Sequence, residues 1–161
     1  MDDTAKTYLT ILAQSLDKKI QVLDQIIEQD QIQLQQLQNP NLEPDEFDQT
    51  VEAKAKLIEE LNLLDQGFEQ IFDRVRHEIG DHKEAYKEEI RSMQEKIRQI
   101  TEKSMQIQTQ EARNKALMEQ KFSAIHKQVR EIRQSQKVVN QYYRNMMKRT
   151  YTEPQFLDNK K

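Results

Sequence analysis

Residues 81–150 read DHKEAYKEEIRSMQEKIRQITEKSMQIQTQEARNKALMEQKFSAIHKQVREIRQSQKVVNQYYRNMMKRT, a stretch without a single Gly or Pro. Apolar side chains recur in it at steps of three and four residues, which is the spacing of one face of an α-helix. At about 1.5 Å per residue, one helix of this length reaches about 100 Å. We therefore predict a single long helix over residues 82–150, with an apolar stripe along most of it.

Two helices about half as long are predicted before this stretch, over residues 4–38 and 44–79. Pro40 ends the first because proline lacks the backbone donor and clashes with the preceding turn. Pro44 suits the first position of the second helix. The short connection makes the two helices antiparallel neighbours. Their apolar seams are interrupted by Asp30 in the first helix and by Lys54 and Asp65 in the second.

Gly80-Asp81 is the next break in the pattern. Glycine suits the left-handed residue that follows a helix, and Asp81 with Glu84 has the form of a capping box. We predict a tight reversal here, and the alternative is a bent but continuous helix.

The unequal helix lengths determine the expected architecture. The first two helices cover the third only as far as about Met118, so the rest of the third helix overhangs. The alternative is a fold-back near Gln110–Leu117 that makes a fourth helix, and the lack of Gly or Pro there favours the overhang. We predict an all-α, antiparallel helical bundle or coiled coil of three long helices, forming one domain over residues 1–151, with a flexible tail at 152–161.

Composition argues against several classes of protein. The chain of 161 residues is 33% charged, 35% hydrophobic and free of cysteine. It lacks an apolar run of the roughly 20 residues that span a bilayer, so no membrane span is expected. The acidic start, Met1-Asp2-Asp3, differs from a signal peptide, so we expect a cytoplasmic protein.

The residues of familiar catalytic and metal sites are not grouped in this sequence. Gly67 and Gly80 stand alone, whereas a phosphate-binding loop needs closely spaced glycines. His77 and His82 are five residues apart, a poor spacing for two ligands on one helix face. We expect a protein that is not an enzyme and that has no cofactor and no metal.

Charge is distributed unevenly between the two halves of the chain. Residues 1–80 contain 7 basic and 17 acidic side chains, and residues 81–161 contain 18 basic and 11 acidic ones. Two interpretations stay open: a dipolar bundle in which basic and acidic helices pair, or a basic helix that steers a partner. Nucleic-acid binding is not expected, because the acidic half repels phosphate.

The overhanging part of the third helix is the predicted partner-binding site. Full burial of one large apolar side chain is worth roughly 1.5–3 kcal/mol, and association costs roughly 4–15 kcal/mol, so a stripe of seven supports binding. A foreign partner and self-pairing, as a fourth helix or a homodimeric coiled coil, both fit the periodicity. Ser104, Glu111 and Asn114 put polar groups in the seam just before the stripe. The stripe consists of Phe122, Ile125, Val129, Ile132, Val139, Tyr143 and Met146.

Two stretches resemble the FlgN-type flagellar export chaperones. They are residues 97–114, IRQITEKSMQIQTQEARN, and residues 64–68, LDQGF, within an all-helical layout that covers most of residues 4–145. The resemblance implies a cytoplasmic, non-enzymatic chaperone. Such chaperones bind the amphipathic C-terminal segment of hook–filament junction proteins, prevent their premature assembly, and deliver them to the flagellar type III export gate.

On this resemblance, the client-binding region begins near Asn114, includes Met118, and continues along the stripe to Met146. The tail that follows, with Tyr151 and Phe156, is short for a contact with the export gate. A self-assembling coiled-coil scaffold without a secretion role is the alternative function.

Overall fold

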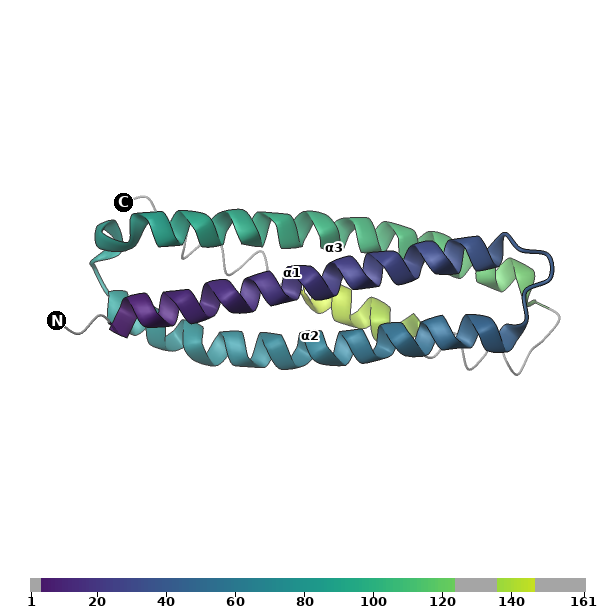
Figure 1. Ribbon diagram of the computed structural model, residues 1–161, viewed down its shortest axis with the longest axis horizontal. Coiled ribbons are helices and arrows are strands. Elements are labelled where there is room, and N and C mark those ends of the chain that lie inside the picture. The colour runs from purple at the N-terminus through teal and green to yellow at the C-terminus, as the bar shows by residue number, and fades with distance from the viewer. Residues whose placement is uncertain (1–3, 124–135, 147–161) are drawn as a thin grey trace.

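The computed structural model describes residues 4–123 and 136–146, and all regular structure in these ranges is helical. Three long helices, α1 (Thr4–Leu37), α2 (Pro44–Ile79) and α3 (Lys87–Lys121), run up, down and up through one bundle (Figure 1). Residues 136–146 form a further helix, which lies alongside the middle of the bundle. The predicted all-α, antiparallel bundle is confirmed.

The connection between α1 and α2 forms as the sequence predicts. The backbone N–H of Asn41 donates to the side-chain oxygen of Asn39 over 2.9 Å, which tightens the turn around Pro40. Pro44 then opens α2, with Asp45 and Glu46 in the first turn. Acidic side chains there are favoured by the partial positive charge of the helix N-terminus.

The connection between α2 and α3 is a tight reversal, as predicted, but α3 begins later than predicted. Gly80 has a φ of 51°, a value that glycine adopts without strain. The chain then forms a 3-10 turn, η1 (Lys83–Tyr86), before α3, and neither start has a side-chain cap. The predicted helix start at His82 and the predicted capping box are therefore wrong, because the 3-10 turn occupies the residues that the box needs.

The three long helices have nearly the same length. They contain 34, 36 and 35 residues, so α3 ends level with the connection between α1 and α2. The predicted continuous helix over residues 82–150, with its overhang, is wrong. The alternative of a fold-back into a fourth helix is correct, although the turn follows Lys121 and does not lie near Gln110–Leu117.

Side-chain packing at the end of the bundle explains why α3 stops without Gly or Pro. Phe122 follows the last helical residue, is 3% exposed, and has its ring 5.8 Å from the ring of Phe47. The ammonium of Lys121 donates to the backbone oxygen of Asn39 over 2.7 Å. Beyond this point α1 and α2 offer no more surface on which α3 can pack. The cluster at this end consists of Leu37, Phe47, Val51, Met118 and Phe122.

Folding back also buries side chains that an overhang leaves in water. Val139, Tyr143 and Met146 are each 0% exposed. Burial of each is worth roughly 1.5–3 kcal/mol, whereas an intrahelical hydrogen bond lost at the turn is worth only about 0.5–1.5 kcal/mol. The hydrophobic gain therefore outweighs the helix propensity of the sequence.

Ion pairs join the acidic first half of the chain to the basic second half. Lys96 of α3 pairs with Asp17 of α1, and Lys103 with Asp24, each over 2.7 Å. Both pairs lie on the bundle surface, so each contributes little to stability. Their arrangement agrees with the interpretation of a dipolar bundle.

We predict that the aromatic pair at the end of the bundle is a major source of stability. Phe47→Ala is expected to lower the free energy of unfolding by about 3–5 kcal/mol, because Phe47 is fully buried. The control Leu63→Ala is expected to change it by less than about 0.5 kcal/mol, because Leu63 is 65% exposed. Urea denaturation of both variants measures the difference, and equal effects would contradict this packing.

Candidate helix-binding site

The bundle has a groove between α2 and α3, on the side opposite α1. α1 packs along both of the other long helices, whereas α2 and α3 make almost no direct backbone contact with each other. The helix at 136–146, which we call the resident helix, contacts α2 through Tyr142 and Asp65 and α3 through Met146 and Ser104, and Figure 1 shows it partly behind α1. The α2–α3 groove is therefore the fourth position of a four-helix bundle, and the chain fills it with its own segment.

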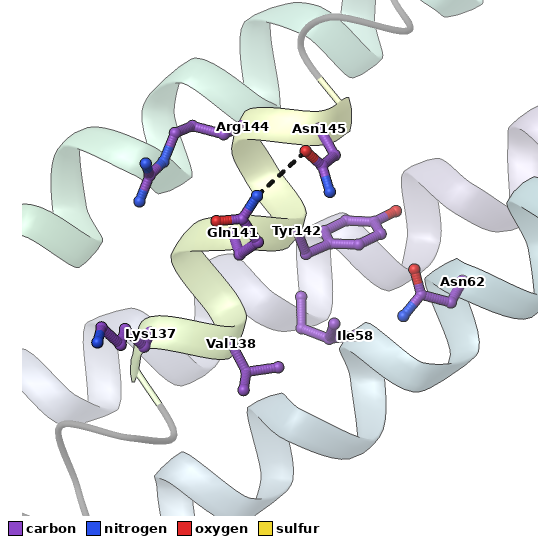
Figure 2. Close-up of a pocket in the computed structure, with 8 residues that line it drawn as sticks. All are labelled: Ile58, Asn62, Lys137, Val138, Gln141, Tyr142, Arg144 and Asn145. Carbon is purple, nitrogen blue, oxygen red and sulfur yellow. Dashed lines mark hydrogen bonds between the residues drawn. The ribbon is translucent and has the colours of Figure 1, made fainter.

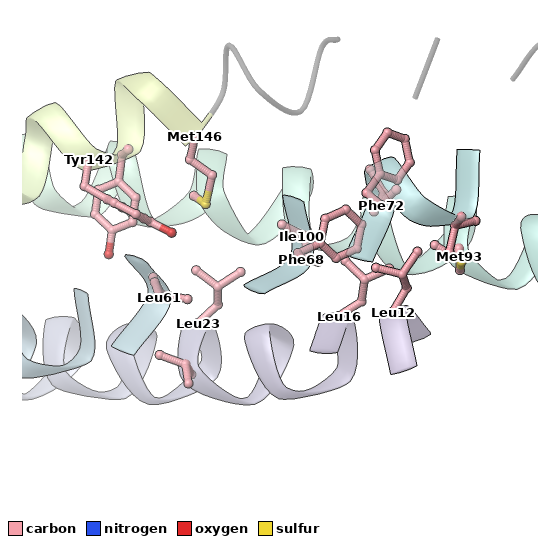
Figure 3. Close-up of a cluster of buried hydrophobic side chains, with 14 of the residues drawn as sticks. Leu12, Leu16, Leu23, Leu61, Phe68, Phe72, Met93, Ile100, Tyr142 and Met146 are labelled. Carbon is pink, nitrogen blue, oxygen red and sulfur yellow. The ribbon is translucent and has the colours of Figure 1, made fainter. Parts of the chain in front are cut away.

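Apolar side chains hold the resident helix in the α2–α3 groove. Four of its residues belong to the same buried cluster as the core of the three long helices. Figure 3 shows Tyr142 and Met146 reaching from the resident helix toward Leu23 and Leu61. The buried apolar residues of the resident helix are Val139, Tyr142, Tyr143 and Met146.

Two polar contacts add direction to this packing. The hydroxyl of Tyr142 donates to Oδ2 of Asp65 over 2.7 Å, and the ammonium of Lys19 donates to Oδ1 of the same carboxylate over 2.7 Å. The hydroxyl of Ser104 lies 3.6 Å from the sulfur of Met146. The resident helix is thus fixed to α2 at one level and to α3 at another.

A layer of buried polar side chains from α1, α2 and α3 crosses the core of the bundle. Nζ of Lys54 donates to Oδ1 of Asp30 over 3.0 Å, to Oε1 of Gln33 over 2.8 Å, and to both carboxylate oxygens of Glu111 over 2.7 Å. Nδ2 of Asn114 donates to the backbone oxygen of Asp30 over 3.0 Å. One ammonium from α2 therefore joins α1 to α3 inside the core.

The polar layer contains more negative than positive groups. Two carboxyls, Asp30 and Glu111, share the single ammonium of Lys54, and all three side chains are at most 2% exposed. Burial raises the pKa of Asp30 to about 8, the nearby Lys54 opposes this shift, and Glu111 adds to it. Asp30 therefore keeps a proton at neutral pH, which lowers the unbalanced negative charge.

The buried phenol of Tyr143, on the resident helix, lies close enough to this layer to interact electrostatically with its carboxyls. Burial raises its pKa well above the usual value, and the charges of Glu111 and Asp30 raise it further. Several buried polar atoms around the layer and in the resident helix have no hydrogen-bond partner within residues 4–123 and 136–146. They are Oδ2 of Asp30, Nε2 of Gln33, both amide atoms of Gln136, and the hydroxyl of Tyr143.

An open groove of about 630 Å³ lies beside the resident helix on its outer side (Figure 2). Ile58 and Asn62 of α2 form one wall, and residues of the resident helix form the other. Val138 is 61% exposed, and Lys137 and Arg144 bring positive charge. The resident helix thus seals the core with its inner face and leaves its outer face accessible.

The structure changes the interpretation of the predicted site residues. Ile125, Val129 and Ile132 lie outside the described residues. Phe122, Val139, Tyr143 and Met146 were predicted to lie on a stripe left bare by the chain, and this prediction is wrong, because the chain buries each of them to at most 3% exposure. Asn114 and Met118, where the resemblance places the start of the client-binding region, are both 0% exposed, and their role in binding stays a prediction.

The sequence analysis identified most residues of the polar layer but did not predict that they contact one another. Asp30, Lys54 and Glu111 were each identified as an interruption of a separate seam. Gln33, Gln136 and Tyr142 were missed, since glutamine and tyrosine are common on helix surfaces. Their contact could have been predicted, because Asp30, Lys54 and Glu111 lie at similar distances from the same end of the bundle.

None of the helices in the described ranges combines the length and the apolar character needed to cross a bilayer. Across the same residues, no three His, Asp or Glu side chains are grouped so that they could hold a metal ion. Comparison of the chain with protein-family models, with curated proteins and with solved structures found no match.

The pKa of Asp30 predicts how stability depends on pH. The folded protein retains a proton on Asp30 between pH 3.8 and about 8, where the unfolded chain has released it. In this range the free energy of unfolding therefore falls as pH rises, by at most about 1.4 kcal/mol per pH unit for one proton. Urea denaturation at several values between about pH 5 and about pH 8 measures this slope.

Asp30→Asn is expected to flatten the pH dependence, because the amide does not titrate. Asp24→Asn is the matched control, since the Asp24 side chain is 53% exposed. Equal slopes in the wild-type protein and in Asp30→Asn would show that Asp30 titrates normally and would contradict this account of the polar layer.

Proposed function

We propose that this protein binds an amphipathic helix of a partner protein in the α2–α3 groove. The main support is that the groove is filled by a helix of the chain itself, while buried polar atoms of Asp30, Gln33, Gln136 and Tyr143 have no hydrogen-bond partner among the residues that the structure describes. Each such group destabilises the packed state by about 1–3 kcal/mol. An imperfectly satisfied occupant is one that a better-matched helix can replace.

In cellular terms, we propose a cytoplasmic, non-enzymatic export chaperone of the FlgN type. Its clients are hook–filament junction proteins, and it holds their C-terminal segments until export through the flagellar gate. The resemblance of residues 97–114 supports this proposal. Asn114, where the client-binding region is expected to begin, donates a hydrogen bond to Asp30 in the polar layer that the resident helix covers.

The proposed mechanism is an exchange of helices. The resident helix leaves the α2–α3 groove, a client helix enters it, and the apolar walls are covered both before and after the exchange. In this mechanism the resident helix competes with the client for the groove. Its side chains Val139, Tyr143 and Met146 are therefore not part of the surface that the client contacts. This differs from the exposed stripe predicted from the sequence, in which the same side chains contact the client directly.

Titration with a client peptide tests this mechanism. Full-length protein is titrated calorimetrically with C-terminal peptides of hook–filament junction proteins, and we expect binding. Val139→Ala/Met146→Ala is expected to bind at least about tenfold more tightly, because the resident helix loses buried contacts and competes less well. The control Val138→Ala is expected to bind as the wild type does, since Val138 is 61% exposed.

Weaker binding in the double variant would mean that the client contacts these side chains, and would contradict the exchange mechanism. Absence of binding to any junction-protein peptide would contradict the chaperone assignment. The alternative function, a self-assembling scaffold, follows from the same groove, because the resident helix of a second copy fits it equally well. Light scattering separates the two: we expect a monomer, and a stable dimer would favour the scaffold.

A further inference from the structure

The three carboxyls around the α2–α3 groove are not equally well paired. Asp65 is paired with the ammonium of Lys19 and accepts a hydrogen bond from Tyr142. Glu111 receives Lys54 at both of its oxygens, each over 2.7 Å. These two carboxylates are therefore satisfied from opposite sides of the core.

Asp30 is the exception. Only its Oδ1 contacts Lys54, at 3.0 Å, and its Oδ2 has no partner among the described residues although the side chain is 2% exposed. When Asp30 is ionised, the desolvation of its buried carboxylate is only partly offset, because a single oxygen contacts an ammonium. A cation brought close to Asp30 would therefore gain the attraction without a further desolvation of the carboxyl.

The resident helix does not supply that cation. Its Tyr143 interacts electrostatically with Asp30 and Glu111, is 0% exposed, and has a hydroxyl without a hydrogen-bond partner among the described residues. Its positive residues, Lys137 and Arg144, line the outer groove instead. The resident helix thus matches the groove in shape and apolar character but not in charge.

We propose that the α2–α3 groove selects partner helices with one Lys or Arg within an otherwise apolar face, at the level that Tyr143 occupies. This rests on the proposed function and names the chemistry of its partner. The basic residue would pair with the free oxygen of Asp30, and apolar residues one turn away on each side would take the places of Val139 and Met146. The same pair would fix the register of the partner helix, as single polar residues do in coiled coils.

The titration of Asp30 is consistent with this proposal. The groups that face it are Lys54 from α2, Glu111 from α3 and Tyr143 from the resident helix, and Asp30 itself lies on α1. Its pKa is raised to about 8, so a bound proton now reduces the negative charge of the layer. A partner cation would displace that proton, and binding would therefore strengthen as pH rises toward 8.

A double-mutant cycle in the full-length protein tests the charge preference. Tyr143→Lys and Tyr143→Met introduce flexible side chains of similar length that differ in charge, and each is made with Asp30 and with Asp30→Asn. Hydrogen exchange of the amides in residues 139–146 reports how tightly the resident helix is held. With Asp30 present, we expect about tenfold more protection in Tyr143→Lys than in Tyr143→Met, and no difference with Asp30→Asn.

Equal protection in the two Tyr143 variants with Asp30 present would overturn the proposal, as would a difference that persists with Asp30→Asn. A second assay stays decisive if Tyr143→Lys fails to fold. Labelled peptides of residues 136–146, with Tyr143→Lys or Tyr143→Met, are titrated with wild-type protein and with Asp30→Asn, and fluorescence anisotropy follows binding. We expect the lysine peptide to bind about tenfold more tightly to the wild type only.

The two proposals fail in different ways. Equal binding of the two peptides overturns the charge preference and leaves helix exchange intact. No binding of either peptide, with a positive result in the hydrogen-exchange cycle, supports the charge preference of the groove and counts against its exchange with an outside helix.

Discussion

One buried ammonium holds the bundle in register. Lys54 reaches from α2 to Asp30 and Gln33 of α1 and to Glu111 of α3, and its side chain is fully buried. Sliding any of these helices by one turn would separate the ammonium from a buried carboxyl, which is far more costly than losing an apolar contact. The layer therefore fixes which residues line the α2–α3 groove. It also leaves that groove with more carboxyl groups than ammonium groups at one level.

The bounds of α1 and α2 were predictable from local signals, because Pro40, Pro44 and Gly80 act through the backbone of their own turn. The end of α3 was not predictable in this way, since it depends on where α1 and α2 stop and on the contact between Phe47 and Phe122. Burial along part of α1 does not follow apolar character. Ile27 and Leu34 are only half-buried, whereas the polar Asp30 and Gln33 are fully buried. Only the partners on α2 and α3 make these polar positions suitable for the core.

Filling the groove with a segment of the same chain has a consequence for binding. A partner helix must displace the resident helix, so its apparent affinity falls by the fraction of molecules in which the groove is open. Partners whose charge matches Asp30 gain an interaction that the resident helix lacks, and those with only an apolar face do not. A covered groove also keeps Val139, Tyr143 and Met146 out of solvent, where they would favour aggregation. The resident helix thus protects the free protein from aggregation and also favours partners whose charge matches Asp30.

The position of the resident helix in the free protein is the claim on which these conclusions depend. Because the chain has no cysteine, spin labels can be attached at Asn62→Cys and Gln141→Cys alone. Pulsed electron paramagnetic resonance then measures the distance between the two labels. The fold-back predicts a distance of about 20 Å, from neighbouring helices 8–10 Å apart plus the two linkers. A distribution centred near 55 Å, as expected for α3 continuing straight to residue 141, would contradict the account.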